Sequence, residues 1–427
     1  MELSFDKIYK IVCAGFEQVI DHRAHNVSYS LRDMLKSGFA IFSLKSPSLL
    51  SFKNRTEIED CNLGSIYDIT DIPSDSCFRK TLDQVNPNAL KHIFNHLYFY
   101  LKKQGWLKAY EVREGFKIIS LDGVHHYSSE KVKCEHCLVK EHRDGSKIYQ
   151  HSMLAAVMVH PDKREVYPID CEAIINEDGK IKNDCELAAS KRLITSMLAH
   201  YKKERFLIVA DALYSVNPFV KQIKEAGWSF VLGVKPKRHK ALFALYEGRK
   251  NRGQLNEYEI IKDGVHHKFS MLNNVSLTNQ KDTVKVNFIH YIQTDQKGEQ
   301  KTFTWITDIK LSKKNCEQIM QIGRSRWKIE NETFNTLKNQ GYHFEHNYGH
   351  GTNHLSTILA ILMLLAFTVD QMQQHGCKLF IAIWDKLKQK SKLWESLRSI
   401  FMIVPCESME NLLIKMTQIW NVPLEDP

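Results

Sequence analysis

The sequence has little of what marks the non-globular classes of protein. It contains 19 Gly and 10 Pro among 427 residues, and 43% of its residues are hydrophobic. This composition excludes disordered, collagen-like and low-complexity chains. It also lacks an apolar run of the roughly 20 residues that a membrane-spanning helix needs. The longest run, residues 355–369, includes Ser356 and Thr368, so we expect it to form a buried helix, and we expect no membrane partner.

Signs of export are missing as well. Glu2 and Asp6 stand where a signal peptide would carry positive charge, and no apolar segment follows them. The ten cysteines are scattered, and only Cys134 and Cys137 are closely paired, so the sequence has no disulfide framework. We therefore expect a cytoplasmic protein with reduced cysteines.

The charge is moderately basic, with a formal net charge of +10 and an isoelectric point near 8.9. An excess of this size is compatible with nucleic-acid binding but does not require it. Three clusters contain many of the basic residues. Each could contact nucleic acid or could simply be a solvated surface. These clusters are residues 202–205, 235–240 and 324–328.

A chain of this length is expected to divide into two or three domains. Residues up to about 112 have helical periodicity, and from Phe116 short apolar runs alternate with a helix that begins near Asn183, with Glu186 as its capping-box partner. Residues 240–310 instead predict antiparallel strands. A long helix over about 313–340 follows.

Two acids stand at the ends of predicted strands. Asp122 ends the apolar run 118–122, and Asp211 ends the run 206–211. Adjacent parallel strands place their carboxyl ends side by side, where open α/β sheets have their sites. Two carboxylates held there are a natural site for Mg²⁺ or Mn²⁺. The alternative is that each Asp simply begins a turn.

A third acid lies on the predicted long helix. At about 100° per residue, Glu330 falls on the same apolar stripe as Trp327, whereas Glu332 points the opposite way. A carboxylate on the buried face of a helix is costly unless it is paired or binds metal. A structural ion pair with Arg326, four residues earlier, stays open as the alternative.

Asp122, Asp211 and Glu330, in this order and these contexts, resemble the DDE triad of transposases from bacterial insertion sequences, within an insertion-sequence-4-like superfamily. The resemblance covers most of the chain. It includes Asp211-Ala-Leu-Tyr214-Ser215, Arg326-x-x-x-Glu330, residues 329–338, Gly341-Tyr342-His343, and residues 48–50 and 72–74 near the N-terminus.

The sequence departs from the related Tyr-Arg-Glu-Lys motif at two positions. That motif has a Tyr three residues before the Arg and a Lys seven residues after the Glu. Here these positions hold Gly323 and Leu337, and Lys338 comes one residue late.

The resemblance implies an α/β (α+β overall) fold: an RNase H-like mixed sheet with flanking helices, an antiparallel β insertion before the last catalytic helix, and a helical N-terminal region. The expected regions are a helical DNA-binding region over 1–112, the first part of the catalytic core over 113–239, the β-rich insertion over 240–310, the second part of the core over 311–375, and a helical C-terminal region over 376–427.

The resemblance also implies an enzyme that cleaves and joins DNA by metal-dependent phosphoryl transfer. Asp122 would bridge two Mg²⁺ (or Mn²⁺) ions, and Asp211 and Glu330 would each hold one. The expected partners are double-stranded DNA, as the terminal inverted repeats of the element and as target, and a second copy of the chain in a homodimer. The location would be the nucleoid of the bacterial cytoplasm. The residues expected to contact DNA are Arg326, Lys338, Lys235, Lys237, Arg238 and Tyr214.

Two further groups of residues have metal-ligand character. Cys134-x-x-Cys137 could hold Zn²⁺, but without a second spaced pair we favour a reduced pair in a loop. For the histidines at 343, 346, 350 and 354 we favour phosphate contact or an ordinary loop over a metal site.

Two other functions remain open from the sequence. One is an RNase H-like nuclease that cleaves DNA without joining it. The other is an inactive DNA-binding repressor derived from a transposase, which the presence of all three acids disfavours.

Overall fold

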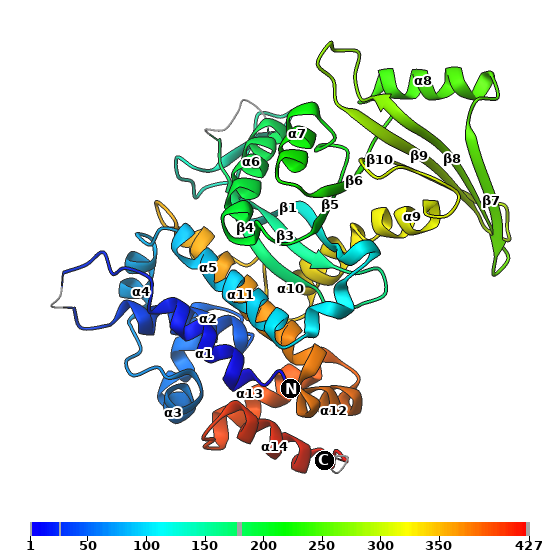
Figure 1. The fold of residues 1–427 in the computed structure, drawn as a ribbon. Helices are drawn as coiled ribbons and strands as arrows, with labels where there is room; N and C mark the ends of the chain where they lie inside the picture. The colour runs from blue at the N-terminus through cyan, green and yellow to red at the C-terminus, as the bar shows by residue number, and fades with distance from the viewer. Residues whose placement is uncertain (1, 25–26, 177–181, 424–427) are drawn as a thin grey trace.

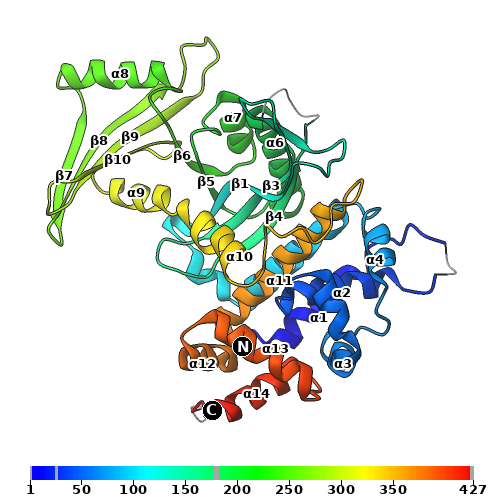
Figure 2. The ribbon, with the colours of Figure 1, turned by 180° about the vertical axis from the view of Figure 1, so that it is seen from behind.

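The structure, a computed structural model, describes residues 2–24, 27–176 and 182–423. A central sheet separates two unlike parts (Figure 1; Figure 2 from behind). Helices from both ends of the chain gather on one side, and an arm of long strands with one helix extends on the other.

The helices and strands follow the alternation that the sequence predicts. The N-terminal region contains α1 (Phe5–Phe16), α2 (Leu31–Ser43), α3 (Leu49–Tyr67), α4 (Asp75–Leu82), α5 (Asn88–Lys103), η1 (Trp106–Tyr110) and η2 (Arg113–Gly115). The central part contains β1 (Lys117–Ser129), β2 (Leu138–Glu141), β3 (Lys147–Val159), β4 (Tyr167–Ile174), α6 (Lys182–Tyr201), β5 (Phe206–Ala210), α7 (Asn217–Glu225) and β6 (Ser229–Gly233). The arm contains α8 (Lys240–Asn251), β7 (Asn256–Lys262), β8 (Val265–Ser276), β9 (Lys285–Thr294) and β10 (Gln300–Thr307). The rest contains α9 (Cys316–Arg324), η4 (Ile329–Phe334), α10 (Asn335–Asn339), α11 (Leu355–Gly376), α12 (Lys378–Leu387), α13 (Lys390–Ile403) and α14 (Met409–Ile419).

The strands of the described residues form one mixed sheet in the order β2-β3-β1-β5-β6-β10-β9-β8-β7, with β4 also paired to β3. β1, β5 and β6 are parallel, whereas β3 runs antiparallel to β1. The parallel strands are apolar and buried on both faces, as expected for strands covered by helices. This arrangement is consistent with an RNase H-like fold and confirms the predicted fold class.

The arm is a continuation of the same sheet, because β10 pairs with both β6 and β9. The predicted strands of residues 240–310 are confirmed. The expectation that this stretch held strands alone was incomplete, because α8 precedes them. Leu242 and Tyr246 of α8 are buried at a spacing of four residues, a helical signal that the sequence carries.

Helices cover both sides of the central strands. α6 and α7 lie on one side, and α5 and α11 lie on the other (Figures 1 and 2). α11 contains the longest apolar run and is buried almost throughout, as the sequence predicts. It is long and apolar enough to cross a membrane by length and composition, and its most apolar window is entirely buried inside the protein.

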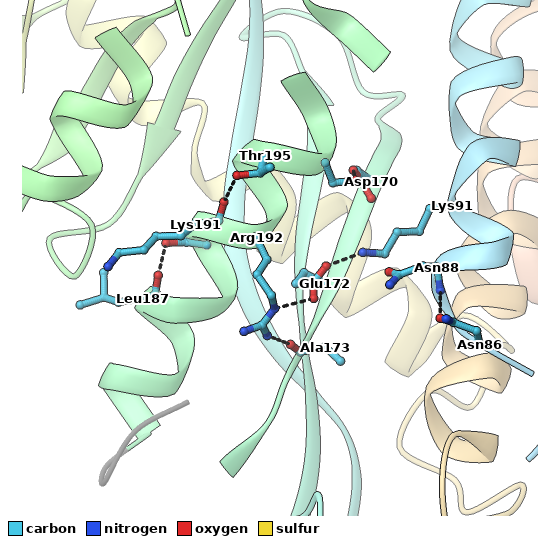
Figure 3. A network of polar contacts seen from close by, with 12 residues as sticks. Asn86, Asn88, Lys91, Asp170, Glu172, Ala173, Leu187, Lys191, Arg192 and Thr195 are labelled. Atoms are coloured by element: carbon cyan, nitrogen blue, oxygen red, sulfur yellow. Dashed lines mark hydrogen bonds and ion pairs between the residues drawn. The ribbon is translucent and has the colours of Figure 1, made fainter. Parts of the chain in front are cut away.

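A partly buried ionic network ties α5 of the N-terminal region to the sheet (Figure 3). Glu172 of β4 accepts from Lys91 of α5 on one side and from Nε of Arg192 of α6, at 2.8 Å, on the other. Arg192 also donates to the carbonyl oxygen of Ala173 at 2.9 Å. Since both cations share one carboxylate, α5 and α6 are joined through the edge of the sheet between them.

The predicted long helix over 313–340 is wrong in one respect. A turn at Ser325 and Arg326 interrupts the helix, and the π-helical segment η4 follows before α10. Trp327, predicted on the buried stripe, is 51% exposed, whereas Phe334 and Leu337 are buried. The turn and the wider π turn change the helical phase on which that prediction for Trp327 depended.

Asp83, just after α4, fixes the start of α11. Its Oδ1 accepts from the backbone N–H groups of Asn353, His354 and Leu355 at 2.9–3.0 Å, and its Oδ2 accepts from Thr352. Burial raises the pKa of Asp83, but these hydrogen bonds outweigh it and leave the pKa below its usual value. The carboxylate therefore caps a helix N-terminus from a distant part of the chain.

We predict that Asp83→Ala lowers the stability of the protein by about 1–3 kcal/mol at pH 7, since a cap and several hydrogen bonds to a charged acceptor are lost. The folded pKa is depressed, so the stabilisation is present above the unfolded pKa of about 3.9 and is lost as the pH falls through the folded value. Thermal unfolding of both proteins from pH 7 down to pH 3 measures it. Asp71→Ala, at an exposed aspartate nearby, serves as control. Equal melting temperatures for the Asp83 variant and wild type would contradict the capping role.

Candidate active site

The pairing of β1 with β5 brings two of the predicted acids to one level of the sheet. Ser120 pairs with Val209 in parallel register, so Asp122 and Asp211 each lie two residues beyond that pair on neighbouring strands. The prediction that Asp122 ends its strand is wrong, because antiparallel pairing with β3 extends β1 to Ser129. Asp211 does follow directly after β5, where its Oδ1 accepts from the N–H of Leu213 at 2.8 Å.

Glu330 is joined to Asp122 through an arginine. Nη1 of Arg326 lies 3.1 Å from Oδ2 of Asp122 and 3.2 Å from Oε1 of Glu330. The backbone of this turn is also fixed to β1, since the hydroxyl of Ser120 donates to the carbonyl oxygen of Arg326 at 3.2 Å. The predicted Arg326–Glu330 pair therefore exists, and the same guanidinium also holds Asp122.

The charges at this site do not balance. Burial raises the pKa of Asp122 to about 7; Arg326 opposes the rise, and the neighbouring carboxylates of Glu330 and Asp211 add to it. Three carboxylates thus act on one another with a single guanidinium between them. An oxygen-only donor set with excess negative charge fits a hard divalent cation, so these residues suit the metal that the resemblance implies.

Glu332 lies apart from this group. Its carboxylate is 4.0 Å from Nε of Arg164, whereas Glu330 faces Arg326 and Asp122. The two glutamates of η4 therefore have different partners, but the predicted difference in burial between them is not seen, since the Glu330 side chain is 37% exposed and that of Glu332 is 31% exposed.

The sequence interpretation missed a fourth acid behind the site. Glu186 of α6 is buried and accepts from the hydroxyl of Tyr214 at 2.7 Å. A Cβ atom on Gly123 would lie 3.1 Å from its carboxyl group, so this acid packs against the backbone beside Asp122. The side chain of Asn183, its predicted capping partner, lies outside the described residues. A signal was present, because Glu186 shares a helical stripe with the buried Leu193.

An open cleft of about 540 Å³ begins at Asp211 and continues along the arm. Its lining includes Asp211 and Arg326 from the site, Lys235 from the loop after β6, and Phe303 and Trp305 from β10. Trp327, half exposed, forms part of the wall, and the guanidinium of Arg326 lies 4.8 Å from its ring centroid. The cleft therefore combines acids, cations and aromatic side chains.

Of the other residues predicted to contact DNA, only Lys235 lines this cleft. Lys235, Lys237 and Arg238 are exposed, and Lys338 forms an ion pair of 2.7 Å with Glu345. Tyr214 requires a correction. Its side chain is fully buried and bonded to Glu186, so in this structure it supports the site from behind and cannot contact DNA.

The pair Cys134 and Cys137 lies elsewhere, in the loop between β1 and β2, with sulfur atoms 3.7 Å apart. Of the four histidines at 343, 346, 350 and 354, only His350 joins this pair, with Nε2 3.4 Å from the sulfur of Cys137.

The sheet order is consistent with an RNase H-like fold, and the level aspartates with the nearby Glu330 form an acidic candidate site on it. Residues 141–369 match the family model described as the transposase DDE domain. Because this match spans more than half of the 427 residues, the chain belongs to the DDE transposase family, which acts on DNA and uses divalent metal ions. The matched part contains Asp211 and Glu330 and begins after Asp122. Comparison with curated proteins gave no match.

Gly323 makes room for an aromatic ring beside the site. A Cβ atom at this position would lie 2.6 Å from ring atoms of Trp305, closer than van der Waals contact permits. The ring of Trp305 is itself stacked on Phe303, with centroids 5.7 Å apart. The indole therefore occupies the space in which the tyrosine of the related motif would begin.

We predict that Gly323→Ala destabilises the protein by about 1–3 kcal/mol, because the added methyl group forces a packed indole to move. Gly248→Ala is the matched control. It is also inside a helix, its nearest neighbour would be an arginine end at 3.7 Å, and removing a helical glycine stabilises by up to about 1 kcal/mol. Thermal unfolding compares the two. If Gly323→Ala melted at or above the wild-type temperature, Trp305 would not be packed as described.

Proposed function

We propose that this protein is a transposase that binds the ends of its own mobile element and catalyses cleavage and strand transfer of DNA. The observation that carries the proposal is the acidic cluster in which Asp122 and Asp211 lie level on neighbouring strands and Arg326 joins Asp122 to Glu330. Membership of the DDE transposase family supports the same reaction.

The acids are proposed to hold two Mg²⁺ (or Mn²⁺) ions, with Asp122 shared between them and Asp211 and Glu330 holding one each. Bound there, such ions activate a water or a 3′-hydroxyl and stabilise the leaving oxygen in phosphoryl transfer. The raised pKa of Asp122, caused by burial and by its acidic neighbours, is what binding of a cation would reverse.

The remaining groups would position DNA. Arg326 lies at the mouth of the cleft with a planar, fully charged head that suits phosphate. Lys235, Lys237 and Arg238 offer further charge along the same side, and the N-terminal helical region would bind the terminal inverted repeats. The active complex is proposed to be a homodimer in the bacterial cytoplasm.

Two alternative functions, a nuclease and a repressor, can be separated from a transposase by experiment. A nuclease of the same fold would cleave but not join, and a strand-transfer assay with a pre-cleaved end separates it from a transposase. A repressor would bind the ends without cleaving them. The clustering of the three acids supports a catalytic protein.

We predict that Glu330→Gln lowers metal-dependent cleavage by several orders of magnitude, because a carboxylate that faces Asp122 loses its charge. Glu332→Gln is the matched control, two residues away on the same segment but directed toward Arg164, and we expect it to stay within a few-fold of wild type. The assay uses DNA that flanks the gene, with Mg²⁺ and with EDTA. Asp122→Asn should bind the same DNA and fail to cut it. Cleavage by Glu330→Gln at the wild-type rate, or loss of cleavage in Glu332→Gln alone, would refute the assignment of the acids.

We further predict a steep dependence of DNA affinity on salt. If Lys237 and Arg238 contact phosphates, replacing both by Gln should flatten the slope of log K against log [salt] by up to about 2 units. Replacing Lys202 and Lys203, an exposed basic pair after α6, gives a control of equal charge. Fluorescence anisotropy over a salt series measures both. An unchanged slope for the Lys237 and Arg238 variant would show that residues 235–240 form a solvated surface and do not contact DNA phosphates.

A further inference from the structure

Four side chains from three separate segments meet at one point away from the acids. They are Cys134 and Cys137 from the loop between β1 and β2, His151 from β3, and His350 from the loop between α10 and α11. One ligand atom of each lies within 4.8 Å of all the others. Cys137, His151 and His350 are buried, and Cys134 is partly buried.

The spacing of these atoms is that of a tetrahedral site. The two sulfur atoms are 3.7 Å apart, three of the four sulfur-to-nitrogen distances measure 3.4–3.5 Å, the fourth is within 4.8 Å, and the two Nε2 atoms are 3.1 Å apart. Tetrahedral bonds of about 2.3 Å to sulfur and 2.0–2.1 Å to nitrogen give edges of about 3.8, 3.6 and 3.4 Å for these three kinds of pair. The four atoms therefore surround a space of the size that Zn²⁺ requires.

A hydrogen bond orients one of the imidazoles for such a role. Nδ1 of His350 lies 2.6 Å from the carbonyl oxygen of Gly351, to which it can donate, so that in a neutral ring the lone pair of Nε2 faces the cluster. A backbone carbonyl in this position is the usual outer partner of a metal-binding histidine. Gly351 has a φ of +71°, and a Cβ there would lie 2.1 Å from Asp83, so the turn that presents His350 is closely fixed.

Two metal-free arrangements, a disulfide and a hydrogen bond between the histidines, do not explain all of these distances. A disulfide needs sulfur atoms about 2.05 Å apart, and 3.7 Å is far longer. A single N–H···N hydrogen bond explains the approach of His151 to His350, but it leaves two thiols directed at the same nitrogen atoms.

We propose that Cys134, Cys137, His151 and His350 form a structural Zn²⁺ site. The four protein ligands would leave no open position, which is the pattern of structural rather than catalytic zinc. This site is separate from the acids, because His151 is four residues along β3 from Ala155, the partner of Asp122, or about 13 Å at 3.3 Å per residue.

The ion would fix the α10–α11 loop to the sheet. This loop follows the segment of Glu330, and the sheet carries Asp122. His350 is the only one of the four ligands that lies C-terminal to η4, and the other three belong to β3 or to the loop after β1. Because binding of such an ion is coupled to folding, zinc would stabilise this arrangement without taking part in phosphoryl transfer.

The test is the metal content of the full-length chain, purified without a metal-affinity tag and dialysed against metal-free buffer with reductant. Elemental analysis should find about one zinc per chain, and Cys137→Ser and His350→Ala should each lower it to below about 0.1. The first control is Cys61→Ser, which replaces an exposed cysteine of α3. The second is His346→Ala, which replaces an exposed histidine in the same α10–α11 loop as His350. Both should keep the zinc, and so should Asp122→Asn, which shows that this ion is not the one at the acids.

A second measurement on the wild-type chain covers the case in which the variants fail to fold. Co²⁺ added to metal-stripped protein should give the visible bands of a tetrahedral ion and a thiolate charge-transfer band, and zinc should displace it. A wild-type chain that retains no zinc and shows no such bands would overturn the proposal. So would a Cys134–Cys137 disulfide found by mass spectrometry of the protein purified under reducing conditions.

Discussion

Arg326 offsets part of the repulsion between the carboxylates of the candidate site. Carboxylates on neighbouring strands and on a nearby helix repel, and burial makes the repulsion more costly because fewer water molecules screen it. One guanidinium within 3.2 Å of both Asp122 and Glu330 offsets part of that cost. The parallel register of β1 and β5, the turn after α9 and the π segment all serve to place these few groups together.

The segment that bears Glu330 must keep its position although it ends in a long loop. Near the start of that loop, the hydroxyl of Tyr342 donates to Asp370, which also forms a fully buried ion pair with Lys45 at 2.6 Å. Removing one partner of such a pair typically costs about 3–5 kcal/mol. At the end of the loop, Asp83 caps α11. Lys45 and Asp83 both belong to the N-terminal region of the chain, so this region helps to hold the loop that follows the Glu330 segment.

Sequence reasoning worked where a physical rule is local. The two aspartates come after apolar strand runs, and the runs of the arm form the antiparallel strands that they predict. It failed where the answer depends on distant segments. No spacing rule joins Cys137 to His350, because they are more than 200 residues apart in the chain and meet only through the fold. The burial of Tyr214 likewise depends on Glu186 of another helix.

The π segment accounts for one departure from the related motif. Seven residues of α-helix turn through about 700°, close to two full turns, so a lysine seven after the glutamate shares its face. A π turn contains about one residue more than an α turn, and η4 (Ile329–Phe334) contains Glu330 and ends before Lys338. Position 338 therefore takes the place that position 337 would have in an uninterrupted helix, which agrees with Leu337 being buried and Lys338 reaching solvent. The offset of one residue in the position of the lysine thus equals the extra residue that a π turn contains, although sequence spacing alone shows only a mismatch.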